Sequence, residues 1–172
     1  MSAYTDALRD AMGMLAEDEK TLFVGQSVIY PGQAAFKTFE LVPMERRVEM
    51  PVVEDFQMGL CTGLSLEGYV PLSFYTRWDF MLLAAGQLVN HLDKLPLMGW
   101  KPKVIIRVAI GRTKPLDPGP QHQGDYSYVF HSMLKTIKML RLESAEDVMP
   151  GYMHALKRDG STILIEKMEL YD

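Results

Sequence analysis

Residues 47–59 have the sequence Arg47-Val48-Glu49-Met50-Pro51-Val52-Val53-Glu54-Asp55-Phe56-Gln57-Met58-Gly59. The run from Arg47 to Val53 is rich in β-branched and apolar residues, which predicts a strand. Glu54 then opens a predicted helix that extends to Gly68, because apolar residues recur in it at helical spacing. Gly59 and Gly63 lie four residues apart on one face of this helix, which lets another backbone approach closely there. A strand that leads directly into a helix is the repeating unit of α/β folds.

The same unit recurs on both sides of this stretch. The pattern predicts an N-terminal helix that buries Leu8, Ala11, Met12 and Leu15, and further helices over 78–95, 126–134 and 144–158. It predicts further strands over 21–25, 69–75, 103–110, 137–142 and 161–166. Strands that are apolar throughout are typical of a parallel sheet covered on both faces. The sequence therefore predicts an α/β fold, as one three-layer α/β/α domain with a mostly parallel sheet that occupies residues 1–172.

Two long segments are predicted to be loops. Residues 26–46 contain Pro31, Gly32 and Pro43, and residues 111–125 contain three prolines and three glycines. Long loops in compact domains usually carry function, and parallel sheets bind ligands beyond the carboxyl ends of their strands. These loops and the start of the Glu54 helix are therefore the places where a site is expected.

Composition excludes several classes of protein. The chain has 172 residues, one cysteine and a formal net charge of −4, and 48% of its residues are hydrophobic. One cysteine allows neither an internal disulfide framework nor a multi-cysteine metal site. The mild acidity argues against a nucleic-acid binder. There is no apolar run near the ~20 residues of a membrane span and no secretory signal, so a cytoplasmic protein is expected.

Few residues indicate chemistry on their own. Glu54 has an ordinary explanation as a carboxylate at a helix N-terminus, where it complements the helix dipole. His122 lies in an irregular polar loop, where it is interpreted either as a proton shuttle or as a solvent-exposed histidine. Cys61 is interpreted as a small buried hydrophobe. The aromatic cluster of Phe74, Tyr75, Trp78 and Phe80 is either core or a platform for a flat ligand. No glycine-rich phosphate motif occurs, and no pair of histidines has the spacing of metal ligands.

The order and spacing of these residues are more specific than any one of them. The chain resembles the pyrimidine-binding domain of transketolase-like thiamine diphosphate enzymes. Within that group it is most similar to the beta subunit of 2-oxo acid dehydrogenases and the central domain of transketolase. The resemblance covers nearly all of the chain. The segments that carry it are 22–28, the strand and helix around Glu54–Gly59, Glu67–Pro71, Phe80 with Gln87–Asn90, Val104–Arg107, the loop Gly119–Gln123 and Arg158–Glu166.

The resemblance implies roles for individual residues. Glu54 matches the glutamate that hydrogen-bonds the pyrimidine ring of thiamine diphosphate and so promotes deprotonation of its thiazolium carbon. An apolar pocket would ready this carboxyl group to share a proton, because burial disfavours its charged form. Phe80 matches a residue that packs on the aminopyrimidine, and His122 a histidine on the substrate side. Arg77 replaces a frequent aromatic residue and can stack on a flat ring, and Gln26 replaces a usual glutamate beside the cofactor.

The resemblance also implies a partner. In that group a separate domain with a Gly-Asp-Gly motif and a downstream Asn holds the diphosphate and Mg²⁺, and Gly124-Asp125-Tyr126 lacks the third glycine. The domain that follows the pyrimidine module in these relatives is not in this sequence either. We therefore expect a hetero-oligomer, with two copies of this chain and two of a chain that carries the diphosphate site. The expected reactions are decarboxylation of a 2-oxo acid or transfer of a two-carbon or acyl group. The alternatives are a non-catalytic scaffold module that kept the fold, and a flavodoxin-like domain that binds another nucleotide.

Overall fold

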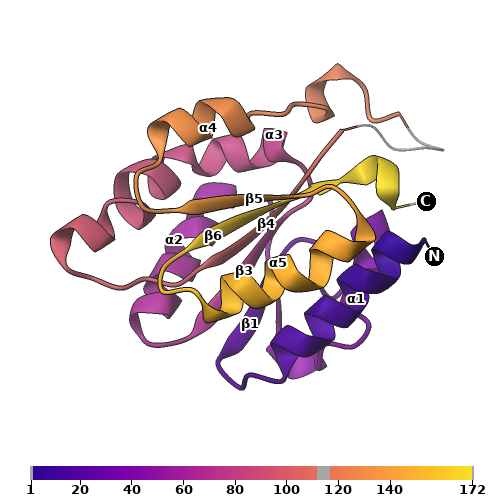
Figure 1. The fold of residues 1–172 in the computed structure, drawn as a ribbon, viewed down its shortest axis with the longest axis horizontal. Coiled ribbons are helices and arrows are strands. Elements are labelled where there is room, and N and C mark those ends of the chain that lie inside the picture. Colours follow the sequence, from indigo (N-terminus) through magenta and orange to yellow (C-terminus); the bar gives the residue numbers. More distant parts are fainter. Residues whose placement is uncertain (1, 112–116, 172) are drawn as a thin grey trace.

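The computed structural model describes residues 2–111 and 117–171. Six strands in these residues form one sheet in the order β2-β1-β3-β4-β6-β5, and every neighbouring pair is parallel (Figure 1). The strands are β1 (Thr21–Gly25), β2 (Arg47–Glu49), β3 (Val70–Tyr75), β4 (Ile105–Ile110), β5 (Lys138–Leu142) and β6 (Thr162–Lys167). The predicted parallel α/β sheet is thus confirmed.

Helices cover both faces of the sheet. Helices α1 (Ala3–Ala16) and α5 (Ala145–Lys157) lie side by side on one face (Figure 1). The other face is covered by α2 (Glu54–Leu66), α3 (Trp78–Met81) and α4 (Ser127–Met133). Each face has its own apolar core, because successive side chains of a strand point to opposite sides. In β4, for example, Ile105 packs on the α1 and α5 side, whereas Ile106 packs on the α2 side.

The predicted helix over 78–95 is broken into pieces. After α3, the chain continues as a 3₁₀ turn (Leu82–Ala84) and a π-helical segment (Gln87–Leu92). The wide turn closes with the amide of Asp93 donating to the carbonyl of Leu88 at 2.9 Å. Asp93 is buried, and its carboxylate accepts the amides of Lys135, Thr136 and Ile137. The apolar periodicity was therefore a correct guide to burial but not to regular helical hydrogen bonding.

Two smaller expectations around α2 also need correction. The strand predicted over 47–53 ends at Glu49, and the following segment contains Pro51, which has no amide hydrogen to continue the ladder. No backbone approaches Gly59 or Gly63 in the described chain. A methyl group at Gly59 would meet only the Gln87 side chain, at 3.6 Å, and one at Gly63 would meet nothing within 4 Å.

A buried charge pair joins the C-terminal turn to the sheet, and the N-terminal helix packs on that turn. Arg107 on β4 donates to Glu166 on β6 at 2.9 Å, and both side chains are inaccessible to solvent. Arg107 also donates to the hydroxyls of Thr38 at 2.8 Å and Tyr171 at 3.1 Å. Near Tyr171, Ser2 donates to the carbonyl of Leu170 at 2.6 Å, so the N-terminal helix and the C-terminal turn meet here (Figure 1).

Candidate active site

The predicted site residues belong to segments that follow the carboxyl ends of neighbouring strands. Helix α2 follows β2, α3 follows β3, and the 3₁₀ turn η6 (Pro120–His122) lies in the connection after β4. Helix α3 packs against η6, and the 3₁₀ turn after α3 packs against α2. The segment after β3 therefore lies between the segments that carry Glu54 and His122, at the edge where parallel sheets bind ligands.

Glu54 is the first residue of α2 and is 4% exposed. Its Oε1 accepts a hydrogen bond from Nε2 of Gln26, which follows β1, at 3.2 Å. In the described residues Oε2 accepts no hydrogen bond, no cation pairs with the carboxylate, and the side chain does not cap its own helix. Glu54 therefore lies in the first turn of α2, where its charge complements the helix dipole, without a capping hydrogen bond from its side chain. Asp55, the neighbouring carboxylate, is exposed.

Gln57 fixes the first turn of α2 to the sheet. It is 1% exposed, and its Nε2 lies 3.0 Å from both the hydroxyl of Ser73 and the carbonyl of Phe74 on β3. The same nitrogen lies 3.4 Å from the carbonyl of Val24 on β1. Sequence patterns did not indicate this residue, although its position one turn after Glu54 on the same helix face was a usable signal.

Phe80 and His122 are brought together, as their joint assignment to one site requires. Their ring centroids are 5.0 Å apart and the ring planes meet at 85°, so the imidazole lies edge-to-face with the phenyl ring. Nδ1 of His122 is buried and has no hydrogen-bond partner in the described chain. Both side chains are partly exposed, which leaves a surface that a ligand can contact.

Asp79 holds the segment that carries His122. Its carboxylate accepts the amide of Gly124 at 3.2 Å and the hydroxyl of Tyr126 at 3.1 Å. The hydrogen bond from Tyr126 to Asp79 raises the pKa of the Tyr126 hydroxyl, because the carboxylate stabilises the protonated phenol. Sequence analysis did not single out Asp79, which ties α3 to the connection after β4.

Arg77 is buried and precedes α3. Its Nη1 donates to the carbonyl of Gly111, at the carboxyl end of β4. Burial lowers the pKa of this guanidinium, whereas the neighbouring Tyr171, Asp79 and Glu169 raise it. A role for Arg77 in stacking on a cofactor stays a prediction.

Exposed apolar side chains lie just before and within the first turn of α2, and on the 3₁₀ turn that packs against α2. We call Val52, Val53, Phe56, Leu82 and Leu83 the apolar rim. Phe56 is 62% exposed, Leu83 is 63% exposed and Val52 is 70% exposed. Exposed apolar groups of this size, next to a buried carboxylate, are typical of surfaces that another molecule covers.

The described residues indicate neither a metal centre nor a reactive cysteine. No group of three or more histidine, cysteine or acidic side chains in them could hold a metal ion. Burial raises the pKa of the Cys61 thiol to about 12, which disfavours the reactive thiolate. No helix in the described ranges is long and apolar enough to cross a bilayer.

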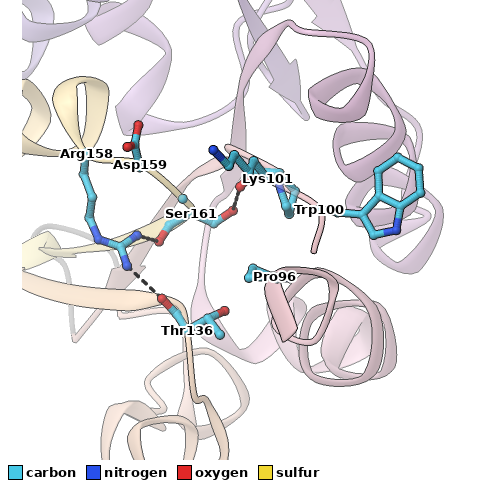
Figure 2. A pocket seen from close by; sticks show the side chains of 9 residues that line it. Pro96, Trp100, Lys101, Thr136, Arg158, Asp159 and Ser161 are labelled. Carbon is cyan, nitrogen blue, oxygen red and sulfur yellow. Dashed lines mark hydrogen bonds between the residues drawn. The ribbon is translucent and has the colours of Figure 1, made fainter. Parts of the chain in front are cut away.

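A hollow of about 190 Å³ lies at the amino ends of β4 and β6 (Figure 2). Arg158 lines it but donates to the carbonyls of Ser161 at 2.7 Å and Thr136 at 2.8 Å. The Ser161 hydroxyl in turn accepts the amide of Val104 at 3.0 Å. These polar groups hydrogen-bond one another. The hollow is therefore interpreted as a structural contact between segments of the chain.

The sheet and its covering helices have the fold of solved transketolase structures. A solved split-gene transketolase, described as an inactive beta4 tetramer, superposes with a TM-score of 0.74 at 19% sequence identity. The superposition covers 98% of this chain and 52% of that one. No profile of a known protein family matches the chain.

Curated relatives place the chain beside beta subunits of pyruvate dehydrogenase. The E1 component subunit beta of Rickettsia conorii is 26% identical over 174 residues, which cover 96% of this chain and 52% of the relative. The mitochondrial subunit of Saccharomyces cerevisiae is 28% identical over 172 residues, which cover 96% and 46%. The chain therefore spans about half the length of the curated relatives it matches.

Proposed function

We propose that this chain is the pyrimidine-binding component of a split thiamine diphosphate enzyme. A partner chain holds the diphosphate and Mg²⁺, and the pair acts on a 2-oxo acid or a ketose, by decarboxylation or by two-carbon or acyl transfer. The observation that carries the proposal is Glu54, a buried carboxylate that opens a helix at the ligand-binding edge of a parallel sheet. The relatives support the class, since they are pyruvate dehydrogenase beta subunits and a split-gene transketolase.

The residues present fit a heteroaromatic ring of this cofactor. Oε2 of Glu54 accepts no hydrogen bond from the described residues, so it can share a proton with a ring nitrogen, while Gln26 donates to Oε1. Phe80 offers a partly exposed aromatic face, and His122 beside it can donate or accept a proton near a substrate oxygen. When bound, thiamine diphosphate supplies the carbon nucleophile for cleavage next to a carbonyl, and this chain orients the ring and manages protons.

The apolar rim is proposed to face the partner chain. It borders Glu54, and a cover over it would exclude water from the carboxylate and strengthen its hydrogen bonds. The split-gene transketolase described as an inactive beta4 tetramer supports self-association as well, so two copies of each chain are proposed.

The deciding experiment replaces Glu54 in the reconstituted pair. The partner is a chain with Gly-Asp-Gly and a downstream Asn, sought in the neighbouring reading frame. We expect Glu54→Gln to lower turnover of pyruvate or of a ketose phosphate by about 100-fold or more, the usual size of a lost proton-transfer group. The exposed neighbour provides the control, since Asp55→Asn removes the same charge.

Full activity of the Glu54→Gln pair would exclude this mechanism. A chain that binds a partner but never responds to thiamine diphosphate in calorimetry would instead support the scaffold alternative. Binding of a flavin or another nucleotide by the isolated chain would support the third candidate, the flavodoxin-like domain.

A further inference from the structure

The turn that follows β1 is strained. Ser27 has a φ of 59°, and it is the non-glycine residue with positive φ in the described chain. This left-handed conformation is unfavourable for a residue with a Cβ atom, and it persists where the surroundings enforce it. The strained residue directly follows Gln26, whose side chain bonds Glu54, so the origin of the constraint bears on the candidate active site.

Glu49 supplies that constraint from the end of β2. One of its carboxylate oxygens accepts the amide of Ser27 at 2.6 Å, and the other accepts the amide of Ile29 at 2.7 Å. Alternate amides that converge on one anion form a nest, and these bonds are short and charge-assisted. Arg47 adds a weaker hold on the same turn, because its Nη1 donates to the carbonyl of Val28 at 3.2 Å.

Gln26 therefore lies between two fixed residues. On one side, the amide of Met50 donates to the carbonyl of Gly25 at 2.9 Å. On the other side, Ser27 is bonded to Glu49. With its backbone held at both neighbours, Gln26 directs its Nε2 at Oε1 of Glu54, at 3.2 Å. Side-chain direction follows from backbone conformation, so a change at Ser27 redirects the Gln26 amide.

We propose that Glu49 is a positioning residue for the candidate active site. Its carboxylate holds the turn 27–29 and thereby aims the side-chain amide of Gln26 at Glu54. The contact between Gln26 and Glu54 belongs to the folded chain itself. The consequence for cofactor binding and turnover rests on the proposed function. The two parts are therefore tested by separate measurements.

The variant Glu49→Gln separates positioning from general packing. It keeps the shape of the side chain but replaces one acceptor oxygen by an amide group that faces an N–H donor. One of the two bonds to the turn is lost, so Ser27 is expected to relax from the left-handed region. Adding Ser27→Gly removes the cost of that region and restores part of the native turn. Glu45→Gln is the matched control, because Glu45 is exposed and the same charge is removed nearby.

The first measurement is the ¹H–¹⁵N side-chain amide signal of Gln26 in the full chain without partner, assigned by its absence in Gln26→Glu. Glu49→Gln is expected to move this signal toward the position of a solvent-exposed amide. Adding Ser27→Gly to Glu49→Gln is expected to reverse part of the shift. The control Glu45→Gln is expected to leave the signal in place. A Gln26 signal that is unmoved in folded Glu49→Gln overturns the proposal, whatever happens to turnover.

The second measurement uses the pair reconstituted with its partner. Glu49→Gln is expected to raise the KM for thiamine diphosphate about tenfold, the equivalent of one charge-assisted hydrogen bond, with a smaller effect on kcat. Ser27→Gly should recover part of this loss. An equal loss in Glu45→Gln overturns the link to the site. Retained activity of Glu54→Gln refutes the proposed function instead, and the amide signal of Gln26 still decides the role of Glu49.

Discussion

Gln57 is a single amide that fixes the position of the candidate active site. It lies one turn after Glu54 and reaches the hydroxyl of Ser73 and the carbonyl of Phe74, each at 3.0 Å. Gln26 makes the complementary link, from the end of β1 to the Glu54 carboxylate. The start of α2 is thus held to two adjacent strands by side-chain amides, which keep the carboxylate at a fixed place along the sheet edge.

Replacement of Gln57 by methionine tests this attachment. Methionine has nearly the same length but no donor, so the acceptors on β3 lose their buried partner. We expect the free energy of unfolding to fall by about 1–3 kcal/mol, measured by urea denaturation. The exposed Asp55→Asn should change it by less than about 0.5 kcal/mol. Equal urea midpoints for the Gln57→Met variant and the native chain would show that the amide bonds do not stabilise the fold.

Sequence patterns and resemblance indicate some residues of the candidate active site and not others. Glu54 and His122 are assigned through the resemblance to thiamine diphosphate enzymes, because the local pattern alone leaves each of them an ordinary structural explanation. Glu49, Gln57 and Asp79 act through hydrogen bonds to groups 22, 16 and 45 residues away in the chain. Such contacts leave no periodic signal in a single sequence, because they depend on the register between distant segments.

At the scale of elements, the segment after β3 shows where periodicity stops being informative. Apolar spacing predicted one helix over 78–95, and the buried side chains of the segment do pack into one core. The observed 3₁₀ and π turns place Asp93 where it accepts the amides of residues 135–137, before β5. The interruption of the helix thus allows Asp93 to contact a loop that is distant in the sequence. The local pattern of apolar residues does not encode this contact.

Asp93→Ala should therefore uncouple this segment from β5. Three amides lose a charged acceptor, and we expect the free energy of unfolding to fall by about 3 kcal/mol. Hydrogen exchange should accelerate at the amides of residues 135–137 before it accelerates in the central strands. His91→Ala is the control, since His91 is exposed in the same segment. Unchanged exchange at 135–137 would contradict the anchoring role of Asp93.

At the scale of the whole molecule, the apolar rim is expected to control assembly. Phe56 and Leu83 are 62% and 63% exposed, so Phe56→Glu with Leu83→Glu should leave the thermal midpoint nearly unchanged. The charges would be buried without partners in an interface, and association should weaken by at least about tenfold. Sedimentation of the mixed chains measures this, with Tyr128→Glu on α4 as the control because Tyr128 is 86% exposed. Unaltered assembly would place the partner on another face.

The buried network around Glu166 is expected to make the folded chain less stable at alkaline pH. Tyr152 donates to Glu166 at 2.5 Å, and the Tyr171 hydroxyl donates to the other carboxylate oxygen. Burial, with the nearby Glu166 charge, raises the pKa of both phenols well above the ordinary value, and Arg107 only partly opposes this. In the unfolded chain both would ionise near pH 10. Above that pH the unfolded state releases protons that the folded state keeps, so stability is present below about pH 10 and falls as pH rises.

We expect the free energy of unfolding to decrease above about pH 10, by up to about 1.4 kcal/mol per pH unit for each such tyrosine. Tyr152→Phe with Tyr171→Phe should lower stability at pH 7, because Glu166 loses two donors, and should also make the decline above pH 10 shallower. The buried Cys61 thiol also contributes to the decline of stability with pH, and this contribution is unchanged in the double variant. Tyr128→Phe, at an exposed position, should retain the full slope. Urea denaturation from pH 8 to 11 measures the slopes, and equal slopes in the double variant and Tyr128→Phe would refute the assignment to this network.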